Sequence, residues 1–153
     1  MLEANGKPDI GQGDNKLSAR PGTGPRTDIP VDADNQVRPG DGGLSVNGCA
    51  CTIPPTIAPQ RLVGIIPGAK RPNTDNRRLW SHGASAFVEG QVSDNLHLRP
   101  NGAADLEGRQ KGYVEPRRQM GFDEYQQAIA SMRDEWNLDE QRNRACPICG
   151  QPE

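Results

Sequence analysis

The clearest hydrophobic pattern lies near the carboxyl end of the chain. Apolar or aromatic side chains recur there at intervals of three and four residues: Phe122, Tyr125, Ile129, Met132 and Trp136. This spacing predicts one apolar stripe along a helix of about four turns that packs against a core. Asp123 and Glu124 stand in its first turn, where negative charge complements the helix dipole, whereas Gly121 is only a fair N-cap.

Shorter apolar segments upstream predict strands. Residues 95–99 alternate polar and apolar side chains, which is the pattern of a half-buried strand and puts His97 on the face opposite Leu96 and Leu98. Three other segments predict short strands: residues 61–66, 79–88 and 113–115. The sequence therefore predicts an α+β fold, a small mixed domain of short strands with one C-terminal amphipathic helix.

The segment of residues 37–46 predicts a tight turn that leads into a strand. It holds three glycines within four positions: Gly40, Gly42 and Gly43. Glycine reaches positive φ and permits close approach of the backbone. Arg38 precedes this turn and Ser45 follows it, so backbone N–H groups and a guanidinium could hold an anionic ligand here. A plain structural β-turn is the alternative interpretation.

Composition places the core in the second half of the chain. Only 33% of the 153 residues are hydrophobic, and all six aromatic residues lie between positions 80 and 136. Residues 1–36 are rich in Gly, Pro, Asp and Asn and bury too little apolar area to offset the entropy of ordering. We therefore expect a disordered N-terminal tail over 1–36, a folded domain over 37–136, and a cysteine-containing tail over 137–153.

Charge gives no strong signal for a polyanionic partner. The formal net charge is −2, and the basic pairs along the chain do not alternate with aromatic residues as in a single-strand-binding surface. No apolar run is long enough to predict a transmembrane helix. The first residues lack the basic and apolar regions of a signal peptide, so we expect a cytoplasmic protein, or one exported without such a peptide.

Four cysteines form two close pairs, Cys49 with Cys51 and Cys146 with Cys149. The second pair has the Cys-x-x-Cys-Gly spacing of a zinc knuckle, and the two pairs together could supply a tetrahedral four-thiolate site. Bound zinc would then stabilise a domain that is poor in apolar residues. Disulfides, or a Cys-x-x-Cys redox pair, are the alternatives.

Glu115 is the most notable titratable residue of the predicted strands. It follows Tyr113 and Val114 and precedes Pro116, so an apolar wall could tune its carboxylate for catalysis. A surface glutamate paired with Arg117 or Arg118 is the alternative.

Two segments together resemble a known family. Residues 37–46 contain a Gly-Gly-x-Ser-Val turn, and residues 113–126 contain an aromatic residue and a proline at a strand end, a methionine, and the start of a helix that closes on Trp136. Across roughly residues 37–136 this resembles the ADP-ribosyltransferase-like toxin domain of Tse-type type VI secretion effectors.

The resemblance implies a domain that binds NAD, transfers ADP-ribose in a competitor cell and has a cognate immunity protein. By this resemblance Arg38 would hold the pyrophosphate beside Gly42 and Gly43, Ser45 would orient the nicotinamide ribose, and Glu115 would be the catalytic acid. Delivery into the target cell would proceed without a signal peptide. A small zinc-stabilised binding module and a non-catalytic adaptor are the alternative functions.

Overall fold

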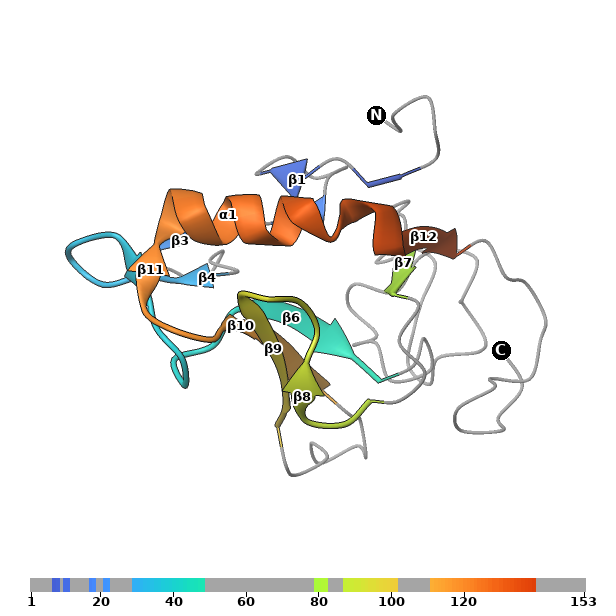
Figure 1. Cartoon of the computed structure of the whole chain (residues 1–153), viewed down its shortest axis with the longest axis horizontal. Helices are drawn as coiled ribbons and strands as arrows, with labels where there is room; N and C mark the ends of the chain where they lie inside the picture. The colour runs from blue at the N-terminus through green and yellow to red at the C-terminus, as the bar shows by residue number, and fades with distance from the viewer. Residues whose placement is uncertain are drawn as a thin grey trace, which may run out of the picture.

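The centre of the structure is a four-stranded antiparallel sheet. The computed structural model describes residues 7–8, 10–11, 17–18, 21–22, 29–48, 79–82, 87–101 and 111–139. The strands of the sheet lie in the order β6 (Leu44–Asn47), β10 (Lys111–Pro116), β9 (Leu96–Pro100) and β8 (Gly90–Gln91). Figure 1 shows this sheet below the helix α1, which covers one of its faces.

The helix α1 (Phe122–Ser131) begins where the stripe predicts, but it ends before Met132 and Trp136, the last two residues of the stripe. Its N-cap is Gly121, which contributes no side-chain hydrogen bond. At Met132 the backbone tightens into the 3₁₀ helix η5 (Arg133–Glu135), and Trp136 begins the strand β12 (Trp136–Asp139). The prediction of one helix as far as Trp136 is therefore wrong in its end, although the whole stripe is buried as expected.

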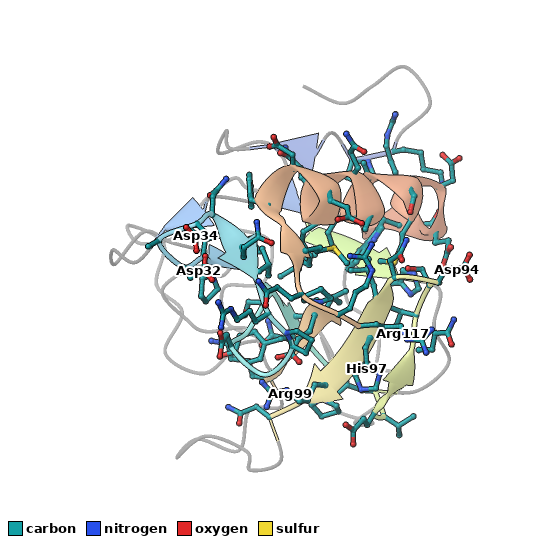
Figure 2. The ribbon with its side chains drawn as sticks, turned by 60° about the vertical axis from the view of Figure 1, so that its left-hand side comes forward. Asp32, Asp34, Asp94, His97, Arg99 and Arg117 are labelled. Carbon is teal, nitrogen blue, oxygen red and sulfur yellow. The ribbon has the colours of Figure 1, made fainter. Side chains whose placement is uncertain are left out.

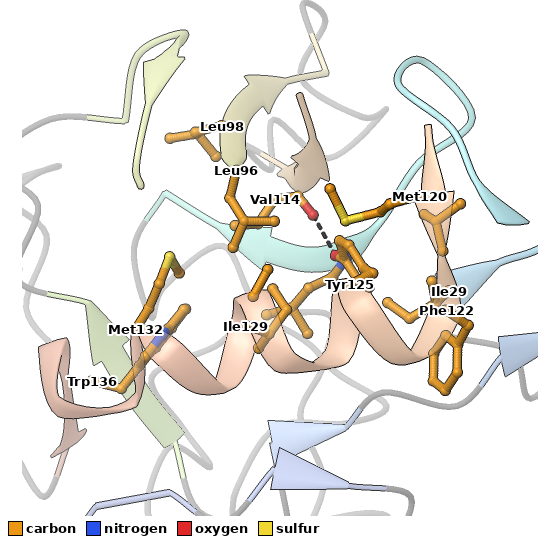
Figure 3. Packing of buried hydrophobic residues seen from close by; sticks show 13 residues of the cluster. Ile29, Leu96, Leu98, Val114, Met120, Phe122, Tyr125, Ile129, Met132 and Trp136 are labelled. Carbon is orange, nitrogen blue, oxygen red and sulfur yellow. Dashed lines mark hydrogen bonds between the residues drawn. The ribbon is translucent and has the colours of Figure 1, made fainter. Parts of the chain in front are cut away.

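One hydrophobic cluster fills the space between the helix and the sheet (Figure 3). Its buried members are Ile29, Val37, Leu44, Leu96, Leu98, Val114, Met120, Phe122, Tyr125, Ala128, Ile129, Met132 and Trp136. The Tyr125 hydroxyl donates to the Val114 carbonyl at 2.5 Å and accepts the Leu44 N–H at 2.8 Å. This one side chain therefore joins the helix to two strands of the sheet.

Short strand pairs surround this centre. The strand β5 (Gln36–Val37) pairs with β11 (Met120–Gly121), and β7 (Leu79–His82) pairs with β12. Two parallel pairs lie upstream, β1 (Ile10–Gly11) with β2 (Leu17–Ser18) and β3 (Pro21–Gly22) with β4 (Ile29–Pro30).

The core extends upstream of Val37, the predicted first residue of the folded domain. Ile29 has no exposed surface, and Val31 packs against the cluster. Lys7 contacts the segment that follows α1. Its Nζ donates to the Asp134 carbonyl at 2.6 Å and to Asn137 Oδ1 at 2.9 Å. Apolar residues of the segment 1–36 thus contribute to the fold in spite of its polar composition.

The structure confirms the α+β class and several of the predicted elements. The strands expected over residues 95–99 and 113–115 are β9 and β10, and the glycine-rich turn leads into β6 as expected. Of the strand expected over 79–88, Leu79–His82 is a strand and residues 87–88 are not, while residues 83–86 lie outside the described residues. The strand expected over 61–66 lies outside the described residues.

Candidate functional site

The register of the sheet gathers polar residues on the face that α1 leaves uncovered. Side chains two positions apart on a strand share a face, and so do antiparallel register partners. Tyr113 of β10 pairs with Arg99 of β9 and with Ser45 of β6, and Glu115 pairs with His97. These five side chains therefore lie on one face, which we call the outer face. As predicted, His97 lies opposite Leu96 and Leu98.

Glu115 is a buried carboxylate held at both of its oxygens. Its side chain is 3% exposed. Arg99 donates from Nε at 3.0 Å and from Nη2 at 2.6 Å to Oε1 of Glu115. The Gly40 N–H donates to Oε2 at 3.1 Å, and Arg99 Nη2 also reaches the Gly40 carbonyl at 3.1 Å. The hydrogen bond with Glu115 is the main cause that raises the pKa of Arg99, with burial opposing it.

The alternative partners of Glu115, Arg117 and Arg118, are engaged elsewhere. Arg117 Nη1 donates to the Asp94 carbonyl at 3.2 Å, and Arg118 forms an ion pair with Glu124 on α1. The expectation of a surface glutamate paired with a neighbouring arginine is therefore wrong, because β9 brings a more distant arginine across the sheet.

The glycine-rich turn lies against this carboxylate. Gly40 and Gly42 have φ of 90° and 111°, which explains why glycine stands at both positions. Gly43 serves close approach instead, since a Cβ there would overlap the Val114 carbonyl oxygen and lie 2.9 Å from the Tyr125 hydroxyl. Both predicted reasons for glycine thus apply, at different residues.

A shallow, open hollow of about 440 Å³ lies over Glu115. It is lined by Pro39, Gly40, His97, Arg99, Glu115, Pro116 and Arg117. Figure 2 shows His97 and Arg99 along β9, with Arg117 nearby. His97 Nε2 lies 3.3 Å from Glu89 Oε1, and its side chain is one-third exposed. Because Arg99 offsets the charge of Glu115, the Arg117 guanidinium on the rim gives the hollow an environment suited to an anionic ligand.

Two of the predicted ligand-binding residues have a different place. Arg38 donates from Nε at 3.0 Å and from Nη2 at 2.7 Å to Asp32 Oδ2, and it is not among the residues that line the hollow. The hydrogen bond from the Gln36 N–H is the main cause that lowers the pKa of Asp32, with Arg38 adding to it. Ser45 is exposed on the outer face, beside Tyr113 rather than Glu115.

The predicted zinc ligands fall outside the described residues: Cys49, Cys51, Cys146 and Cys149. Within the described residues, no three His, Cys, Asp or Glu side chains gather to hold a metal ion. The four-thiolate site therefore stays a prediction.

The sequence reasoning missed Arg99 as a site residue. The signal was present, because Arg99 follows His97 at a spacing of two in the strand predicted over 95–99 and must share its face. What was missing was the register that sets this strand against Glu115.

No family model, curated protein or solved structure matches the chain. No helix in the described part of the chain is long and apolar enough to span a membrane.

Proposed function

We propose that the chain is an ADP-ribosyltransferase-like toxin domain that binds NAD in the hollow over Glu115. One observation carries this proposal: a carboxylate that is 3% exposed lies beneath an open hollow whose rim holds Arg99, Arg117 and His97. The resemblance of residues 37–46 and 113–126 to such toxins meets this observation at Glu115, which it assigns as the catalytic acid.

The chemistry of the transfer matches these side-chain types. The bond between the ribose carbon and the nicotinamide nitrogen breaks, its electron pair leaves with nicotinamide, and positive charge develops on the ribose. A fixed carboxylate stabilises that charge, because a preorganised group needs no reorganisation as the transition state forms. The acceptor then forms the new bond to the ribose carbon and loses its proton. The Arg117 guanidinium at the rim suits the pyrophosphate of NAD.

The other assigned residues take different parts in this proposal. Ser45 and Tyr113 extend the outer face beyond Arg99 and can contact a ligand that reaches past the hollow. The backbone of Gly42 and Gly43 belongs to the turn that packs against β10, the strand that carries Glu115. Arg117 replaces Arg38 as the candidate contact of the pyrophosphate, because Arg117 lines the hollow whereas Arg38 is bound to Asp32.

The test is expression of the full chain in a bacterial host, with growth and cellular NAD followed over time. Glu115→Gln keeps the size of the side chain and removes its charge, and we expect the rate of NAD consumption to fall by about 10²–10³-fold. Arg118→Gln is the matched control, because Arg118 pairs with Glu124 outside the hollow. We expect it to arrest growth as the wild type does.

Two results would contradict the proposal. One is growth arrest by Glu115→Gln as strong as that by the wild type, provided that both proteins accumulate equally. The other is a purified wild-type chain that neither binds NAD in calorimetry nor consumes it. The resemblance also implies a cognate immunity protein, whose co-expression with this chain would restore growth.

A further inference from the structure

We infer that Arg99 and Gly40 are positioning residues that fix the carboxylate of Glu115, a conclusion that rests on the proposed function. We call the three residues the clasp. Glu115 comes from β10, Arg99 from β9 and Gly40 from the glycine-rich turn, so three separate segments meet at one carboxylate. The clasp assigns a role to Arg99 and Gly40 that neither the sequence nor the resemblance suggests.

The hydrogen bonds of the clasp leave little freedom to the carboxylate. Each carboxylate oxygen has about two acceptor positions. Arg99 occupies both positions of Oε1 with Nε and Nη2, and the Gly40 N–H occupies one position of Oε2. One acceptor position of Oε2 therefore remains for a ligand. Rotation of the carboxylate would break hydrogen bonds at both oxygens together.

Stability alone does not explain the clasp. A buried ion pair contributes little net stability, because desolvation of two charges offsets their attraction. The clasp also lies on the outer face, where the Arg99 side chain is 40% exposed and lines the hollow. An ion pair that opens onto a hollow is better suited to hold one geometry than to stabilise the core.

The backbone at Gly40 completes the arrangement. A Cβ at Gly40 would meet no atom within 4 Å, so the space around this residue does not require glycine. Its φ of 90° does, and that conformation directs the N–H of Gly40 to Glu115 while its carbonyl accepts from Arg99. The turn therefore acts as the third point of attachment.

The test separates positioning from ligand binding by the steady-state kinetics of NAD consumption. In Arg99→Gln the carboxylate loses the guanidinium that donates twice to Oε1, and we expect kcat to fall by about 10²-fold with little change in KM, as for a misplaced catalytic group. Arg99→Lys keeps the charge without the fork, so it should restore only part of kcat. Arg118→Gln is again the control, expected to match the wild type in both constants.

A second measurement reports the clasp without activity. In NMR spectra of the full chain, Glu115→Gln should shift the Gly40 amide and the Arg99 Nε–H resonances, because both groups donate to Glu115. Unshifted resonances would overturn the clasp whether or not the wild type consumes NAD. A rise in KM with unchanged kcat in Arg99→Gln would overturn it too, since Arg99 would then only bind ligand. If Glu115→Gln produces the shifts but the wild type neither binds nor consumes NAD, the proposed function is overturned, and the catalytic role of the clasp with it.

Discussion

Removal of the Tyr125 hydroxyl tests the contact that joins the helix to the sheet. Tyr125 is completely buried, and its hydroxyl serves the Val114 carbonyl and the Leu44 N–H at once. Phenylalanine at this position keeps the ring and its packing. The substitution Tyr125→Phe therefore leaves two buried backbone groups without this partner and opens no large cavity.

The magnitude follows from the cost of a buried polar group that loses its hydrogen bond, about 1–3 kcal/mol. We expect Tyr125→Phe to lower the free energy of unfolding by about 2 kcal/mol, because the Leu44 N–H loses the hydroxyl that accepts it in a site closed to water. This loss is a large part of the free energy of unfolding of a small domain, which is about 5–15 kcal/mol.

The assay is urea unfolding followed by circular dichroism. Tyr113→Phe is the matched control, because Tyr113 lies half-buried on the outer face, where Lys111 stands over its ring at 5.4 Å from the centroid. We expect the control to change the free energy of unfolding by no more than about 0.5 kcal/mol. Equal losses in the two variants would refute the reasoning, because the position of the hydroxyl would then not matter.

Alkaline pH gives the same contact a second signature. Burial raises the pKa of the Tyr125 phenol above its ordinary value near 10. The phenol then ionises first in the unfolded chain, so its contribution to stability is complete below about pH 10 and is lost as the pH rises further. The stability difference between the wild type and Tyr125→Phe should therefore shrink as the pH rises from about 10 to about 12. A difference that stays constant over that range would contradict the assignment.

Two further predictions concern the glycine-rich turn. Gly43→Ala places a Cβ against the Val114 carbonyl and should lower the free energy of unfolding by about 1–3 kcal/mol in a urea titration. Gly90→Ala, whose Cβ would meet nothing within 4 Å, is its control, and an equal loss there would contradict the close approach. Arg38→Ala should leave the affinity for NAD unchanged in calorimetry, because Arg38 is bound to Asp32. A marked loss of affinity for NAD would contradict this prediction and show that Arg38 contacts the ligand.

Local patterns predicted the elements whose signals are local. The alternation at residues 95–99 expresses one face of a strand, the stripe from Phe122 to Ile129 expresses one face of α1, and both sets of apolar residues are buried. The end of the helix could not be read from the stripe. Met132 and Trp136 stay buried after the helix stops at Ser131, because the 3₁₀ turn keeps them on the side of the core.

The candidate site needed information that no local pattern contains. Glu115 was found because a carboxylate in an apolar strand is unusual, yet its partners stand 16 residues away at Arg99 and 75 residues away at Gly40. Only the antiparallel register brings them together. Arg38 was chosen for its closeness to the turn in sequence, and Asp32, six residues upstream, binds its guanidinium instead.

The two faces of the sheet have different roles: the inner face forms the core, and the outer face carries the candidate site. The inner face packs against α1, and the Tyr125 hydroxyl makes two buried hydrogen bonds there. The outer face carries the desolvated charge of Glu115, which costs free energy and which the core does not require. Val114 belongs to the first face and Glu115 to the second, one residue apart on β10. Rigid packing on one side therefore fixes the backbone that holds the carboxylate on the other. This coupling favours a site whose geometry is set before any ligand arrives.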